Sequence, residues 1–91
     1  MIINDRDREI LTITQEEAAE VIQEISKVMR FGIDAMHRDG MPHRERLASE
    51  VGDLLCMIDL MIDNRMVDPA AIVLAKQAKI DKLRKYSRIY S

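Results

Sequence analysis

Hydrophobic residues recur every three or four positions over most of this chain, and two short segments interrupt the pattern. The interruptions are Phe31 to Pro42, which holds two glycines and a proline, and Val67 to Pro69. Spacings of three and four are typical of helices that bury one face, whereas strands alternate apolar and polar positions. The pattern therefore predicts three helical segments, and we expect an all-α fold.

The first helical segment runs from Thr14 to Met29 and carries a single apolar stripe. The sequence does not fix the first residue of this helix. Thr14 and Glu17 form a capping-box pattern, but Asp5 to Leu11 is also compatible with a helix. The stripe consists of Ala18, Val21, Ile22, Ile25, Val28 and Met29.

The second segment, from His43 to Met66, is apolar around most of its circumference. A helix of this kind is expected at the centre of a bundle, buried on more than one side. Gly52 lies inside it, where glycine costs about 1 kcal/mol relative to alanine. We therefore expect a neighbouring helix or a ligand to approach the backbone closely at Gly52, and Cys56 to be a small core residue.

The third segment extends from Pro69 to about Tyr86 and has a basic C-terminal end. Asp68 followed by proline fits an N-cap and first helical position, because proline has no N–H to leave unpaired there. Lys79 and Lys82 have two interpretations. They either contact the phosphate oxygens of a substrate or only complement the negative end of the helix dipole.

The amount of apolar sequence is large for the length of the chain. A domain of 91 residues buries only about 60–65% of its unfolded surface, yet 47% of the residues are hydrophobic. This surplus predicts a small helical bundle of about three main helices per chain, completed by oligomerisation. The formal net charge of −2 gives no general reason to bind nucleic acid or an anionic membrane, so neither is an expected partner.

The sequence has few features that are typical of an exported protein. The lone Cys56 cannot form an internal disulfide, which suits a reducing compartment, and we expect a cytoplasmic location. No apolar run approaches the length of a membrane span, and the stretch from Met1 to Arg8 is charged. Neither a signal peptide nor a membrane span is therefore expected.

Pairs of acidic residues stand on the first two segments at helical spacing. Glu17 and Glu20 are three positions apart, as are Glu50 and Asp53. Two antiparallel helices would bring these four carboxylates to one patch, where like charges repel unless cations lie between them. Oxygen ligands of this kind suit Mg²⁺, or Mn²⁺, rather than zinc.

Simpler interpretations of the same acids remain. Glu17 can serve only as the capping partner of Thr14, and Glu16 only as a favourable charge in a first helical turn. Glu24 is expected on a solvated face rather than as a fifth ligand. Asp59 and Asp63 are expected to be surface or interface charges. No Glu-x-x-His pair is present, which disfavours a ferritin-like di-iron site.

The order Glu16-Glu17-x-x-Glu20 and then Glu50-x-x-Asp53 resembles the signature of the MazG-like, all-α nucleoside triphosphate pyrophosphohydrolases, over residues 12 to 65. The resemblance implies one MazG-like domain over residues 1–91, with Mg²⁺ held by Glu17, Glu20, Glu50 and Asp53. It implies that Glu16 supports a ligand or orients the attacking water. It also implies cleavage of a nucleoside triphosphate to the monophosphate and pyrophosphate, by a homodimer or a dimer of dimers.

One feature departs from that family. The 29 residues between Glu20 and Glu50 form a longer gap than most members have, and the excess falls in the loop rich in glycine and proline. This loop bears on substrate choice more than on catalysis. The aromatic residues are Phe31, Tyr86 and Tyr90, and the sequence singles out none of them for stacking against a base.

An alternative function is a non-enzymatic helical dimer that acts as an interaction module. In that case the inward acids pair with lysine or arginine across the interface. The two functions differ in their response to Mg²⁺, since clustered carboxylates gain stability from the ion and salt-bridged carboxylates do not.

Overall fold

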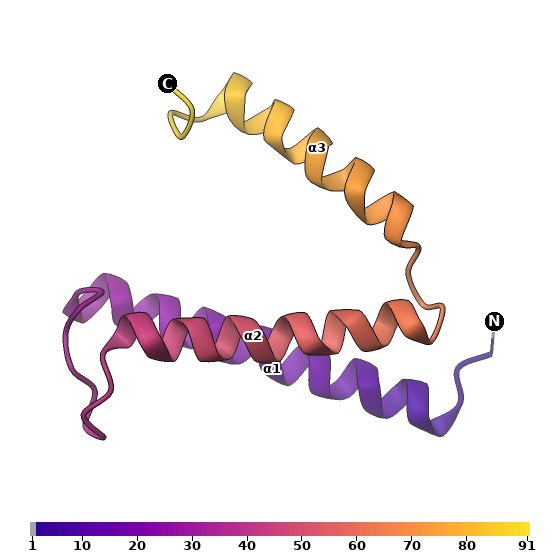
Figure 1. Ribbon diagram of the computed structural model, residues 1–91, viewed down its shortest axis with the longest axis horizontal. Coiled ribbons are helices and arrows are strands. Elements are labelled where there is room, and N and C mark those ends of the chain that lie inside the picture. The colour runs from indigo at the N-terminus through magenta and orange to yellow at the C-terminus, as the bar shows by residue number, and fades with distance from the viewer. Residues whose placement is uncertain (1) are drawn as a thin grey trace.

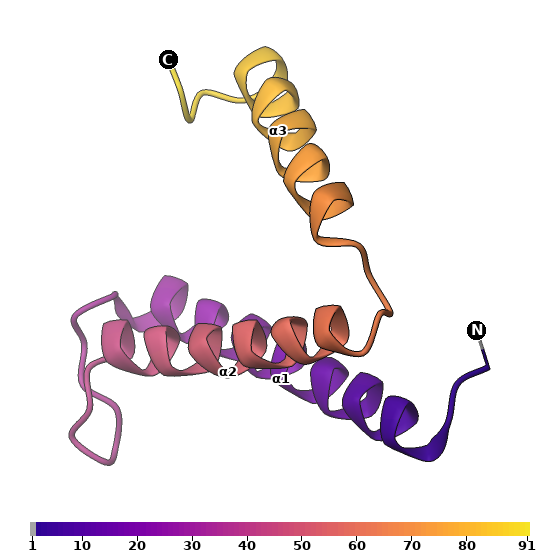
Figure 2. The same cartoon turned by 45° about the vertical axis from the view of Figure 1, so that its right-hand side comes forward.

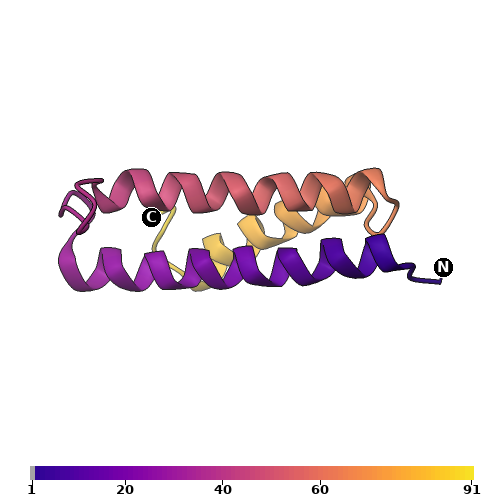
Figure 3. The same cartoon turned by 90° about the horizontal axis from the view of Figure 1, so that it is seen from below.

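Three α-helices make up the chain in the computed structural model, which describes residues 2–91 (Figure 1). They are α1 (Asp5–Phe31), α2 (His43–Asp63) and α3 (Pro69–Tyr86). No strand occurs within residues 2–91, so the all-α expectation is confirmed for this part of the chain. The helices α1 and α2 run antiparallel and side by side as a hairpin (Figure 3).

The helix α1 begins well before Thr14. Asn4 is its N-cap, and the Asn4 side chain accepts a hydrogen bond of 2.8 Å from the backbone N–H of Asp7. Thr14 lies inside the helix, where its hydroxyl donates to the carbonyl of Ile10. The capping-box interpretation of Thr14 is therefore wrong, because Asn4 and the acidic first turn supply an earlier start.

The helix α2 ends at Asp63, three residues before the Met66 predicted from the sequence. The N–H of Met66 donates to the carbonyl of Met61, and the N–H of Arg65 donates to that of Ile62. This pair of bonds is the Schellman arrangement, which requires a left-handed residue just after the helix. Arg65 fills that position with φ of 62°.

The chain has almost no apolar core of its own. Ile10 and Met57 are the hydrophobic side chains in residues 2–91 that are buried. Leu55 on α2 is 55% exposed and Leu60 is also exposed, so the expectation of a helix buried on several sides is wrong for the single chain. The reason is that, among the described residues, α1 is the helix that makes extensive contact with α2.

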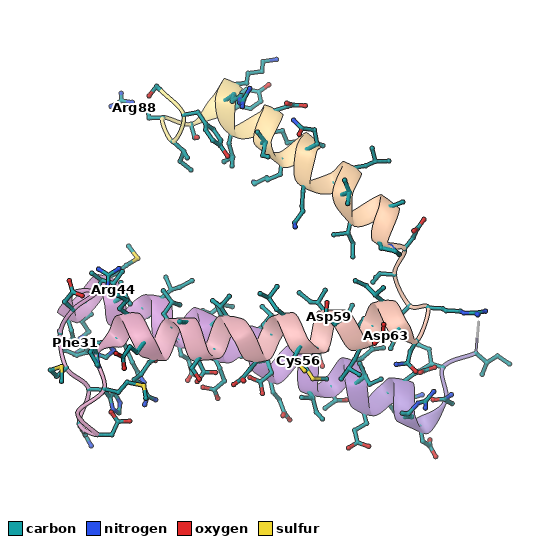
Figure 4. The ribbon with its side chains drawn as sticks, in the orientation of Figure 1. Phe31, Arg44, Cys56, Asp59, Asp63 and Arg88 are labelled. Atoms are coloured by element: carbon teal, nitrogen blue, oxygen red, sulfur yellow. The ribbon has the colours of Figure 1, made fainter. Side chains whose placement is uncertain are left out.

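The core position expected for Cys56 is wrong for the single chain, and of the two explanations for Gly52 the neighbouring helix is wrong while the ligand stays a prediction. Cys56 is exposed rather than part of a core, and Figure 4 shows its sulfur at the surface of the hairpin. A Cβ placed on Gly52 would meet no neighbouring atom within 4 Å. No element of residues 2–91 therefore approaches the backbone closely at Gly52.

The helix α3 begins as the sequence predicts but does not pack against the hairpin. The Asp68 side chain accepts a hydrogen bond from the N–H of Ala70, and Pro69 occupies the first turn. None of the α3 residues is buried. In two views α3 diverges from α1 and α2 (Figures 1 and 2), and the molecule measures 44 × 37 × 14 Å. Within the described residues, no helix has the length and apolar character needed to cross a membrane.

Candidate metal centre

Three acidic side chains from the two hairpin helices meet near the middle of the hairpin. Glu17 comes from α1, and Glu50 and Asp53 come from successive turns of α2. One carboxylate oxygen of each residue lies within 4.8 Å of the others. The i, i+3 spacing points both α2 acids to one side, and antiparallel packing places Glu17 opposite them.

This acidic cluster (Glu17, Glu50 and Asp53) carries uncompensated charge. Partial burial raises the pKa of the Glu17 carboxyl, and the negative charges of Asp53 and Glu50 raise it further. The charges of Glu20 and Glu16 act in the same direction. Within residues 2–91 no lysine, arginine or histidine nitrogen forms a salt bridge with any member of the acidic cluster.

The donor set suits a hard divalent cation. The acidic cluster supplies carboxylate oxygens and no imidazole or thiolate. Mg²⁺ binds oxygen at about 2.1 Å, so two ligands of one ion lie at most about 4.2 Å apart. Oxygens that already lie within 4.8 Å need only small side-chain rotations to reach that geometry. The residues present therefore fit Mg²⁺ or Mn²⁺.

The other acids of the sequence motif stand beside the acidic cluster. Glu16 and Glu20 are exposed on α1 and are not part of the three-residue group. Glu20 lies one turn from Glu17, near enough for its charge to act on that carboxyl. The structure thus brings together three of the four predicted ligands, and the roles of Glu20 as ligand and Glu16 with water stay predictions.

Lys79 and Lys82 stand on a different helix from the members of the acidic cluster. Both are exposed on α3, which diverges from the hairpin (Figure 1). Neither lysine forms an ion pair with the acidic cluster within residues 2–91, so their phosphate-binding role stays a prediction.

A second charged cluster lies one heptad nearer to the loop and was missed by sequence reasoning. It consists of Glu24, His43 and Arg46, which are displaced by seven residues from Glu17, Glu50 and Asp53 respectively. Glu24 is 2% exposed, so its expected solvated position is wrong. The available signal was the repeated spacing, since residues seven apart lie on the same side of a helix.

This compensated cluster (Glu24, His43 and Arg46) is held by direct contacts. Nδ1 of His43 lies 2.8 Å from Oε1 of Glu24, and both side chains are 3% exposed. Arg46 brings Nε to 3.6 Å from the second oxygen of Glu24. The Arg46 guanidinium also donates to the Asp39 carboxylate at 2.6 Å, which ties the loop to both helices.

The charges around Glu24 reverse the effect seen at Glu17. Burial raises the pKa of Glu24, but the hydrogen bond from His43 and the nearby cationic side chains together outweigh burial and leave the pKa below its ordinary value. An ionised Glu24 accepts a hydrogen bond from the Nδ1–H of His43, which leaves Nε2 of that ring for another partner.

Comparison of the chain with models of known protein families, with curated proteins and with solved structures found no match. The chemistry of the two clusters is therefore the basis for assigning a function.

Proposed function

We propose that this protein is a MazG-like, Mg²⁺-dependent nucleoside triphosphate pyrophosphohydrolase that removes surplus or unwanted nucleotides. The observation that carries the proposal is the acidic cluster, in which carboxylates from two helices converge without a cation from the described chain. Its residues match the order of the motifs that resemble the family. Like charges at this spacing are unfavourable unless a cation binds between them.

Each acid has a distinct role in this mechanism. Glu17, Glu50 and Asp53 would hold Mg²⁺, and Glu20 would complete the ligand set from the next turn of α1. When bound, Mg²⁺ neutralises the carboxylates and the triphosphate and lowers the pKa of bound water. Glu16 orients the attacking water. The oxygen of this water joins phosphorus and the water releases a proton to solvent as the anhydride bond between the α- and β-phosphates breaks, which yields the monophosphate and pyrophosphate.

A homodimer, or a dimer of dimers, completes the site in this proposal. Large hydrophobic side chains are exposed on all three helices, and the single chain buries little apolar surface. Exposed apolar surface on this scale is typical of an interface. A second copy would also allow Lys79 and Lys82 of its α3 to reach phosphates at the acidic cluster. The exposed hydrophobic side chains of the three helices include Ile22, Met29, Leu55, Val73 and Leu74.

The test is a pyrophosphate-release assay over the common nucleoside triphosphates, with Mg²⁺ or with EDTA. The variant Asp53→Asn removes one carboxylate charge from the acidic cluster. Asp59→Asn is the matched control, because Asp59 is an exposed aspartate on the same helix (Figure 4). We expect Mg²⁺-dependent release that is lost in Asp53→Asn and retained in Asp59→Asn.

The alternative is a non-enzymatic helical dimer, and the exposed apolar faces also suit it. Thermal melting separates the two functions. A metal centre predicts a rise in Tm with Mg²⁺ that Asp53→Asn abolishes. No pyrophosphate release from any nucleotide, together with no Mg²⁺-dependent rise in Tm, would favour the interaction module.

A further inference from the structure

A cavity of about 530 Å³ opens at the loop end of the hairpin, beside the compensated cluster. Its volume lies in the range of about 300–1,000 Å³ that is usual for small-molecule sites. Residues from α1, the loop and the start of α2 line it, and Phe31 lies at this end of the hairpin in Figure 4. The residues that line the cavity include Lys27, Phe31, Met36, His37, Arg38 and His43.

The loop that forms one wall of the cavity has a defined backbone. Met36 and Pro42 form a bridge, and the N–H of His37 donates to the carbonyl of Met41 at 2.9 Å. The N–H of His43 donates to the carbonyl of Ala35 at 3.0 Å. Because these bonds fix the loop against α2, the cavity is a preformed feature of the hairpin.

Aromatic rings gather beside the cavity. The ring of Phe31 stacks parallel to that of His43 with centroids 5.9 Å apart, and His37 meets His43 edge-on at 5.8 Å. Phe31 is 55% exposed, and Met36 adds an exposed thioether. Planar, polarisable ligands gain most from such a surface, and nucleobases are of this kind.

The polar groups at the cavity are mainly hydrogen-bond donors. The Arg38 guanidinium forms no hydrogen bond or ion pair with the residues that the structure describes. The Lys27 ammonium lies 3.9 Å from Glu24, too far for a hydrogen bond. Arginine and lysine have donors and no acceptor, so they favour the carbonyl edge of a base over an amino edge.

The position of the cavity relates it to the acidic cluster. Glu24 and His43 are each seven residues from members of the acidic cluster, which is about 10 Å along a helix. Seven residues is close to two full turns, so His43, which lines the cavity, lies on the same side of α2 as Glu50 of the acidic cluster. A nucleotide with its phosphates at the acidic cluster would therefore extend its sugar and base along α2 toward His43 and the cavity.

We propose that this cavity binds the base of the nucleotide substrate and prefers bases with a carbonyl at purine position 6 or pyrimidine position 4. Guanine, uracil and thymine belong to this class, and adenine and cytosine do not. This assignment rests on the proposed function and adds to it a substrate class, with Arg38 as the residue that determines specificity.

The kinetic test compares dGTP and dUTP with dATP and dCTP in the wild type, in Arg38→Ala and in Arg44→Ala. Arg44 is the matched control, because it is an exposed arginine of the same region that pairs with Asp34 and does not line the cavity. We expect kcat/KM to fall about tenfold or more for dGTP and dUTP in Arg38→Ala, mainly through KM, and less than twofold for the other two nucleotides. Arg44→Ala should retain the wild-type preference. Hydrolysis without a base preference, or a preference that Arg38→Ala leaves intact, would overturn the assignment.

A binding measurement keeps this inference separate from the proposed function. Backbone amide shifts are recorded as GMP, AMP or inorganic phosphate is added to the wild type without Mg²⁺. We expect GMP to shift residues 31–38 at lower concentration than AMP, and Arg38→Ala to remove the difference. Equal effects of GMP and AMP, no effect of either, or equal effects of phosphate alone would contradict base recognition. Failure of pyrophosphate release with all nucleotides, by contrast, would contradict the proposed reaction even if GMP binds selectively.

Discussion

The acidic and compensated clusters occupy equivalent places on the same pair of helices, one heptad apart, yet they differ in charge balance. At the compensated cluster, His43 and Arg46 stand where Glu50 and Asp53 stand at the acidic cluster. The negative charge of the buried Glu24 is therefore balanced by cationic side chains and a hydrogen bond from His43, and its pKa is lowered. At the other cluster three carboxylates face each other, and the pKa of Glu17 is raised.

The difference separates a carboxylate that the chain itself balances from carboxylates whose charge no cationic side chain of residues 2–91 balances. The chain has 14 basic residues against 16 acidic ones, so cations are not scarce. Their absence from the acidic cluster leaves a position that an external cation can fill. Glu24 is hydrogen-bonded to His43 and ion-paired with Arg46, and it stabilises the loop end of the hairpin instead.

The largest expected effect comes from replacing the α1 carboxylate of the acidic cluster. Glu17→Gln should lower pyrophosphate release at least about a hundredfold, because loss of a metal ligand removes several kcal/mol of transition-state stabilisation. In EDTA the same variant should have a higher Tm than the wild type, since repulsion within the acidic cluster is relieved. A lower Tm in EDTA would show that the carboxylates stabilise the fold without a cation. An activity assay gives the rate of pyrophosphate release, and thermal melting of the same samples in EDTA gives the Tm.

The same substitution one heptad away should have the opposite effect on stability. Glu24→Gln removes the charge that His43 and Arg46 face, which should lower the free energy of unfolding by about 2 kcal/mol. The rise in Tm with Mg²⁺ should remain, because Glu24 is not a member of the acidic cluster. Urea denaturation with and without Mg²⁺ measures the free energy of unfolding and its increase on metal binding. Loss of the Mg²⁺ response in Glu24→Gln would show that the two clusters act as one site.

The dependence of stability on pH should also differ between the two glutamates. The folded pKa of Glu24 is lowered, so its contribution is present above the ordinary pKa of 4.5 and is lost as pH falls through the folded value. The folded pKa of Glu17 is raised, so its contribution is present below 4.5 and is lost as pH rises through the folded value.

Unfolding free energies between pH 3 and 7 in EDTA test this contrast. Glu24→Gln should reduce the loss of stability on the acidic side. Glu17→Gln should reduce the loss on the side toward neutral pH. Parallel curves for the wild type and both variants would contradict the assigned directions.

The smallest expected effect comes from Arg65→Gly, a control substitution that should stabilise the hairpin and that changes no member of either cluster. Arg65 adopts a left-handed conformation after α2, and glycine adopts it without steric penalty. Arg65→Gly should raise the free energy of unfolding by about 0.5–1 kcal/mol. The shift in Tm with Mg²⁺ should be unchanged, and a changed shift would mean that the metal response reflects general stability rather than the acidic cluster.

The sequence predicted the local structure well and the burial poorly. The three helices follow from apolar spacing, and the start of α3 follows from Asp68 and Pro69, because these signals are local. The exposure of Cys56 and Leu55 was not predictable, because the apolar pattern shows which face avoids water and not whether a neighbour in the same chain covers it.

The candidate site shows the same limit. The meeting of Glu17 with Glu50 and Asp53 follows from helical spacing once the helices are antiparallel. The burial of Glu24 depends on His43, 19 positions away, and periodicity along one helix contains no information about that partner. The cavity beside Phe31 depends on the conformation of the loop, which the sequence marked only by its glycines and proline.

The separation of α3 from the hairpin has a consequence for hydrogen exchange. Most of the stability of a helix in a protein comes from the packing of its apolar face, and no α3 residue is buried, so we expect α3 amides in a lone chain to be protected by little more than the helix–coil equilibrium. Amides in α1 and α2 exchange only when the hairpin opens, because each helix covers the other. Slow exchange in α3 at high protein concentration, and rapid exchange on dilution, would then report directly when a second chain covers this helix.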